Sequence, residues 1–198
     1  MVGSPVEMAR SRRHGRARTV VASPISLLVG SAALAVGTAA LILTRHPLIA
    51  GFVALLAATA LLAGSSSAQR DGGPAGRFAE QVADRTFDAC LLAPLAWVLR
   101  LGAARPAVVA LVALGASFVA SYERARGESL GYRGHEGLGY RALRAALLVA
   151  GLLSGWLEAT LWLYVILTLA ATAARAWNVV LQQRRVGAEL PPAGTSAS

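Results

Sequence analysis

Six long apolar runs, separated by short polar stretches, dominate this chain of 198 residues. A helix that crosses a bilayer needs about 20 mostly apolar residues, and in lipid its backbone polar groups must be satisfied within the helix. Each run is therefore predicted to be a spanning helix. The expected spans are residues 20–43, 47–64, 78–99, 106–122, 139–155 and 157–176. The predicted fold is all-α, a polytopic membrane protein with six transmembrane helices.

Composition agrees with this pattern. Hydrophobic residues make up 56% of the chain, charged residues only 15%, and the mean hydropathy is +0.55, which a soluble domain of this length seldom carries. We expect three parts: a basic cytoplasmic N-terminal segment over 1–19, a six-helix membrane domain over 20–185, and a disordered polar tail over 186–198. Ser154-Gly155-Trp156 provides the turn that makes the last two helices a hairpin.

Arginines at the ends of the spans predict the orientation. All nineteen cationic residues are arginine, and cytoplasmic loops of membrane proteins retain positive charge. With the N-terminus inside, only Arg45, Arg100 and Arg105 lie outside. The chain is therefore expected to be a multi-pass protein of the cell membrane, with both termini cytoplasmic.

The third span begins with a row of carboxylates. Glu80, Asp84 and Asp88 are spaced at i, i+4 and i+8, so a helix places all three on nearly one face. Carboxylates at membrane depth are costly and usually turn inward toward a cavity, a partner charge or an ion. Two interpretations follow: the row serves a functional site, or Arg77, Arg85 and the Arg124/Arg126 pair simply neutralise it in a structural network.

An arginine-rich loop, SYERARGESLGYRGHEGLGYRALR over Ser121–Arg144, separates the fourth and fifth runs. Arg141 and Arg144 are at i and i+3 and share a helical face. With Arg126 they are able to hold a phosphate through bidentate contacts, which guanidinium supports better than ammonium. The alternative is that these side chains only snorkel to lipid headgroups.

These two stretches together resemble the CDP-alcohol phosphatidyltransferases, a family of six-helix membrane enzymes of phospholipid synthesis. Gly76, Glu80 and Asp84 are similar to the second half of the family signature, with glutamate in place of one aspartate, and GRFAEQVADR resembles the family's GxFLDxxADR. The arginine-rich loop resembles the segment that follows in the family. Its matching residues are Ser121, Tyr122, Arg126, Glu128, Gly131, Arg141 and Arg144.

The first half of the signature is missing. No acidic residue occurs between Glu7 and Asp71, so the family's first two aspartates have no counterpart at the end of the second span. The resemblance leaves three candidates for binding the donor. They are Gly64 and Arg70, near the missing half, and Gly76 from the second half. Asp71-Gly72-Gly73-Pro74 lies too close to Glu80 to supply the missing half and is interpreted as a turn.

The resemblance implies a transfer of a phosphatidyl or other phosphoalcohol group from a CDP-linked lipid donor to an alcohol. It implies Asp84 as the catalytic base, Glu80 and Asp84 as ligands of Mg²⁺ or Mn²⁺, and Arg126, Arg141 and Arg144 as the acceptor-phosphate site. Because half of a two-metal site is absent, metal binding is expected to be weak or absent and transfer impaired. A catalytically inactive relative that acts as a lipid-nucleotide-binding or interaction subunit remains the alternative.

Partners follow from the same resemblance. Membrane lipids and the CDP-linked donor are expected, and nucleic acid is not. The family is usually dimeric, and small residues such as Gly30, Ala33 and Gly37 in the first run permit close helix approach. A homodimer is therefore a possible assembly.

Overall fold

The computed structural model describes residues 23–71, 73–102, 104–132 and 138–189. This part of the chain forms six helices and no strand. They are α2 (Pro24–Leu43), α3 (Pro47–Asp71), α4 (Gly73–Leu99), α5 (Ala104–Ser129), α6 (Leu138–Ser154) and α7 (Leu157–Glu189). The all-helical fold class is confirmed, and the helices fall on the six apolar runs.

Local chemistry explains where several helices begin and end. At the start of α2, the Ser23 hydroxyl accepts a hydrogen bond from the Ser26 backbone N–H at 3.1 Å, and Pro24 occupies the first turn, where its missing N–H costs nothing. Between α6 and α7, Gly155 has φ +76°, a left-handed conformation that glycine adopts without steric cost. The turn predicted at Ser154-Gly155-Trp156 is therefore present, and it is only two residues long.

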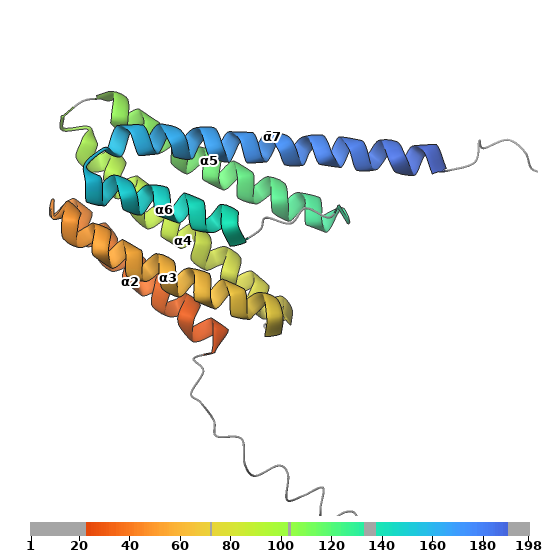
Figure 1. The fold of residues 1–198 in the computed structure, drawn as a ribbon, viewed down its shortest axis with the longest axis horizontal. Helices are drawn as coiled ribbons and strands as arrows, with labels where there is room; N and C mark the ends of the chain where they lie inside the picture. The colour runs from red at the N-terminus through yellow and green to blue at the C-terminus, as the bar shows by residue number, and fades with distance from the viewer. Residues whose placement is uncertain (1–22, 72, 103, 133–137, 190–198) are drawn as a thin grey trace, which may run out of the picture.

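The helices form one antiparallel bundle (Figure 1). α2 and α3 pack as a hairpin, α4 packs against both, and α5 packs against α4. α7 lies against α5, while α6 lies between α3 and α7. The core is built from alanines and leucines with two large aromatic side chains, Phe87 and Tyr164, which are almost fully buried. The alanine face of α3, which includes Ala50, Ala54 and Ala57, lets neighbouring helices approach closely.

Four of the six helices are long and apolar enough to cross a membrane. These spans are Pro24–Leu43, Pro47–Arg70, Ala104–Ser129 and Leu157–Gln182. α4 carries five charged side chains between Arg77 and Asp88, which lower its hydropathy, and α6 is only 17 residues long. Large apolar side chains on the outer faces are exposed, as expected of a surface that faces lipid. The chain therefore has the features of a membrane protein, with four apolar spans where the sequence pattern predicts six.

The last helix is longer than predicted. Its 33 residues correspond to about 50 Å, and Figure 1 shows its C-terminal part extending past the ends of the other helices. The expected disordered tail began at residue 186, but α7 continues to Glu189. The last span was expected to end at residue 176, and the helix continues through Gln182–Arg185, whose residues are polar but good helix formers. Residues 190–198, and the basic segment 1–19, lie outside the described residues.

Candidate functional site

The three carboxylates of α4 lie on its buried face. Glu80 is 3% exposed, Asp84 5% and Asp88 3%. The i, i+4, i+8 spacing thus stacks them as the sequence predicts, and they face helices α5 and α6 rather than lipid. Burying an ionised carboxylate costs several kcal/mol unless a partner charge and hydrogen bonds compensate. Every one of the three has such a partner.

Glu80 lies at one end of the row, between α3 and α6. Its Oε1 atom accepts hydrogen bonds from Arg141 Nη1 and from Gln69 Nε2, the latter at 3.2 Å. Arg141 is 6% exposed, and its Nε has no hydrogen-bond partner within the described part of the chain. The pair joins α4 to α6, and Gln69 adds α3 to the same contact.

Asp88 lies at the other end and is the most connected carboxylate. Its Oδ2 atom accepts from Arg144 Nη2, from the Ser117 hydroxyl at 2.6 Å, and forms an ion pair with Arg85 Nη1 at 3.1 Å. Arg144 also donates from Nε to the Tyr164 hydroxyl at 3.1 Å. Side chains of α4, α5 and α6 therefore meet at one carboxylate, and Tyr164 of α7 is joined to them through Arg144.

Asp84 lies between these two groups. Its Oδ2 atom is paired with Arg85 Nη2, and Arg85 Nη1 donates to the backbone carbonyl and hydroxyl of Ser117 at 2.6 and 2.5 Å. Arg85 thus links Asp84 to Asp88 and holds α4 against α5. We call the set of Glu80, Asp84, Arg85, Asp88, Ser117, Arg141, Arg144 and Tyr164 the charge cluster.

The structure buries a different arginine of α5 from the one the sequence suggested. Arg126 is exposed, whereas Arg124 is 7% exposed and lies close enough to Arg141 and Asp84 to interact electrostatically. Two residues along a helix correspond to about 200°, so the two arginines point to opposite sides. The signal that was missed is the spacing of seven between Ser117 and Arg124, which puts them on one face.

Arg141 and Arg144, the other two candidates for the acceptor phosphate, are both in the cluster. In the structure they are paired with Glu80 and Asp88, so the guanidinium groups expected for a phosphate contact carboxylates. Arg85, expected from the sequence as a neutralising partner of the row, is paired with Asp84 and Asp88. Gln69, Ser117 and Tyr164 were not among the residues expected in the site.

The three donor-binding candidates have structural roles in the folded chain. A side chain at Gly64 would meet Leu28 of α2 at 2.9 Å, so this glycine permits the close packing of α2 on α3. Gly76 is buried beside Ala68 of α3, at 3.5 Å from where its Cβ would lie. Arg70 is exposed and donates from Nε to the Ser66 carbonyl at 3.1 Å. None of these contacts connects the three to the charge cluster.

The donor set does not fit a two-metal site. No group of three or more histidine, cysteine or carboxylate side chains converges within the described ranges. Glu80 and Asp84 each accept from a guanidinium, and Glu80 also accepts from the Gln69 amide, a hydrogen-bond donor that α3 presents to it. A pair of divalent ions requires more oxygen ligands than these side chains supply.

Comparison with known proteins does not assign the chain to a family. No family model matches it, and no curated protein matches it either. The likeness to CDP-alcohol phosphatidyltransferases therefore depends on the motif residues themselves and on what the structure does with them.

Proposed function

We propose that this chain is a CDP-alcohol phosphatidyltransferase-like protein of the cell membrane, with six spans and both termini in the cytoplasm. Its buried arginines bind the phosphate groups of a CDP-linked lipid and of a phosphorylated acceptor. Transfer of the phosphoalcohol group is much slower than in members with a complete aspartate motif. The observation that supports this function most directly is the convergence of Arg124, Arg141 and Arg144 beside Glu80 and Asp84.

Transfer requires the charged side chains of the charge cluster to exchange one another for the substrates. In the transfer, the acceptor oxygen forms a bond to phosphorus, the bond to CMP breaks, and Asp84 takes the proton from the acceptor hydroxyl. Asp84 is paired with Arg85 in the structure, so it acts as a base only when Arg85 turns to an incoming phosphate. Arg141 and Arg144 likewise exchange a carboxylate for phosphate oxygens. Charge-assisted, bidentate contacts make that exchange feasible.

The second candidate is a catalytically silent binding or interaction subunit. Two observations favour it: every carboxylate of α4 is already compensated by a guanidinium, and Glu80 also accepts a hydrogen bond from the Gln69 amide of α3. A cluster that is complete without ligand stabilises the bundle as it stands. In this case phosphate binding persists and transfer is absent.

A transferase assay separates the two candidates. The full chain in detergent is given labelled CDP-diacylglycerol with Mg²⁺ and a mixture of glycerol phosphate, inositol phosphate and serine. Slow formation of labelled phospholipid that Asp84→Asn abolishes supports the enzyme. Nucleotide binding without any product supports the silent subunit, and absence of both contradicts a nucleotide site altogether.

Calorimetric titration with CDP and CDP-diacylglycerol tests the binding residues. Replacing Arg124 or Arg141 by glutamine is expected to weaken binding by about tenfold or more, because a charge-assisted hydrogen bond is lost. Arg126→Gln is the matched control, since it removes the same charge from the same helix on the exposed side. Equal losses for Arg124→Gln and Arg126→Gln would show a non-specific charge effect and no buried phosphate site.

A further inference from the structure

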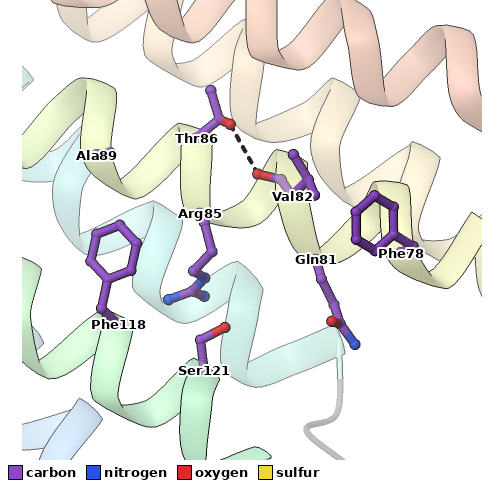
Figure 2. A pocket seen from close by; sticks show the side chains of 8 residues that line it. All are labelled: Phe78, Gln81, Val82, Arg85, Thr86, Ala89, Phe118 and Ser121. Atoms are coloured by element: carbon purple, nitrogen blue, oxygen red, sulfur yellow. Dashed lines mark hydrogen bonds between the residues drawn. The ribbon is translucent and has the colours of Figure 1, made fainter. Parts of the chain in front are cut away.

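A cleft of about 440 Å³ lies on the outer side of α4 and α5, next to the charge cluster. Figure 2 shows its walls: Phe78, Val82 and Arg85 from α4, and Phe118 and Ser121 from α5, with Gln81 extending along the opening. Most of the lining is apolar, and its phenylalanines belong to the exposed surface, with Phe78 70% and Phe118 48% exposed. The cleft therefore opens to the surroundings of the bundle and not to its core.

The charge of the lining has one sign. Arg85 is the charged residue among the described residues that line the cleft, and no carboxylate lines it there. The Arg85 side chain keeps 15% of its surface exposed, while its terminal nitrogens are paired with Asp84 and Asp88 of the charge cluster. Gln81 and Ser121 add polar groups beside it. The lining thus combines apolar walls with the exposed edge of one guanidinium and two neutral polar groups, which complements the phosphate and acyl chain of a lipid.

The dimensions fit a phospholipid. Phe78 and Ala89 mark the two ends of the cleft on α4, and eleven residues of helix correspond to about 16 Å. This is roughly half the thickness of a bilayer core, the depth of one leaflet. The end at Phe78 lies near the start of α4, on the side where arginines are concentrated.

We propose that this cleft binds one anionic phospholipid of the inner leaflet, separately from any nucleotide site. The phosphate contacts Gln81, Ser121 and Arg85 in the half of the cleft nearer Phe78, and an acyl chain continues from there past Phe118 and Ala89 toward the centre of the bilayer (Figure 2). Because Arg85 also holds Asp84 and Asp88, the lipid contacts the charge cluster from outside the bundle. Arg85 is also the group that the proposed transfer draws to an incoming phosphate, but the cleft exists without that function and is tested without it.

Native mass spectrometry of the full chain in detergent tests the proposal. The protein is incubated with equal amounts of dioleoylphosphatidylglycerol, which is anionic, and dioleoylphosphatidylcholine, which is zwitterionic. We expect one phosphatidylglycerol retained per chain, with a preference of about fivefold over phosphatidylcholine. Equal retention of the two lipids would overturn the proposal.

Three variants locate the site. Gln81→Glu places a carboxylate beside Arg85 without removing any contact of the charge cluster, and it is expected to abolish the preference; Gln81→Lys is expected to increase it. Phe118→Ala is expected to lower retention of both lipids. Phe52→Ala is the matched control, because Phe52 is a phenylalanine of α3, 62% exposed, that does not line the cleft.

Size-exclusion chromatography and thermal unfolding check that each variant is folded. If one variant does not fold, the remaining two variants still test the proposal. Equal behaviour of Phe118→Ala and Phe52→Ala would overturn the proposal. So would a dimer that retains no lipid and that Phe118→Ala converts to monomers, since a second copy of the chain would then occupy the cleft.

Discussion

Asp88 shows at the scale of one residue how the bundle accommodates charge. It accepts from Arg144 and Ser117 and is paired with Arg85, and only 3% of it is exposed. In so dry a position the ion pairs offset a large desolvation cost instead of adding a large net stability. Removing one partner leaves the others buried and uncompensated.

Asp88→Asn is therefore expected to destabilise the protein by about 3–5 kcal/mol, because the guanidinium groups of Arg85 and Arg144 lose a shared counter-charge. Glu123→Gln is the matched control. Glu123 is paired with Arg175 at 3.4 Å and keeps 26% of its side-chain surface exposed, so a change of about 0–1 kcal/mol is expected. Equilibrium unfolding in mixed detergent measures both. Similar losses for the two variants would contradict a specifically buried network at Asp88.

The residues that sequence reasoning missed share one physical cause. The spacing of Glu80, Asp84 and Asp88 predicts a common face, and the structure has it. Spacing within α4 says nothing about which residues of other helices face that row. Ser117, Tyr164 and Gln69 are ordinary polar residues in their own segments, and their roles come only from how the five helices α3 to α7 meet. Arg126 was chosen over Arg124 for the same reason, because helix orientation is set by packing.

At the scale of the elements, Gln69 of α3 makes its contact with Glu80 of α4 a hydrogen bond from a neutral amide and not a cation site. Its amide donates to Glu80 Oε1 at 3.2 Å, so it compensates the carboxylate that Arg141 also contacts. A carboxylate at this position would repel Glu80 unless a cation lay between them. Two carboxylates are the number with which magnesium sites in proteins are often built.

Gln69→Glu is thus expected to lower thermal stability in the presence of EDTA and to make it rise with added Mg²⁺ or Mn²⁺, as mass action requires of a ligand that binds only the folded state. The wild-type protein should respond little to either ion. The control Arg70→Glu places a carboxylate at the neighbouring exposed position, away from Glu80, and changes the charge by −2 where Gln69→Glu changes it by −1. A divalent response of equal size in the control would show surface screening and no new site.

The α6–α7 hairpin depends on a glycine at its closest approach. A Cβ added at Gly151 would overlap Thr160 Oγ1 and lie 3.3 Å from Thr160 Cβ. By contrast, a Cβ at Gly30 of α2 would meet nothing within 4 Å, so the small residues that suited helix approach in the first run are not packed against another described helix. Sequence alone does not distinguish these two glycines.

Gly151→Ala is expected to destabilise the bundle by about 1–3 kcal/mol through overpacking. Gly30→Ala should be neutral or stabilising by up to about 1 kcal/mol, because alanine has the higher helix propensity. Adding Thr160→Ala to Gly151→Ala removes the overlapping hydroxyl and should restore part of the loss. Thermal unfolding of the four proteins checks this, and a double variant no better than Gly151→Ala would place the strain elsewhere.

For the whole molecule, the arrangement of helix ends bears on the topology. Figure 1 shows the α2–α3, α4–α5 and α6–α7 connections at one end of the bundle, and the α3–α4 connection and the end of α7 at the other. The three arginines assigned to the outside, Arg45, Arg100 and Arg105, all belong to the first end. Arg105 lies there in an exposed ion pair with Glu158 at 2.5 Å.

This grouping agrees with the proposal that six helices span the membrane, in which α4 crosses despite its charged side chains and α6 despite its length of only 17 residues. The buried carboxylates of α4 are tolerated because they are paired with arginines inside the charge cluster. The short helix α6 packs between α3 and α7. α4 packs against α2, α3 and α5, which are all long and apolar enough to span. If these three helices cross the membrane, α4 lies at the same depth between them.

Cysteine labelling in intact cells tests this topology. In a Cys90→Ser background, a membrane-impermeant maleimide is expected to label Gly102→Cys, in the α4–α5 connection, without permeabilisation. It should label Ser129→Cys, an exposed position at the end of α5, only after the membrane is opened. Thr44→Cys serves as a second outside position, since it follows α2. Because helix α4 alone separates the α3–α4 connection from Gly102, labelling of Gly102→Cys from the cytoplasmic side only would mean that α4 does not span, and that the charge cluster is not at membrane depth.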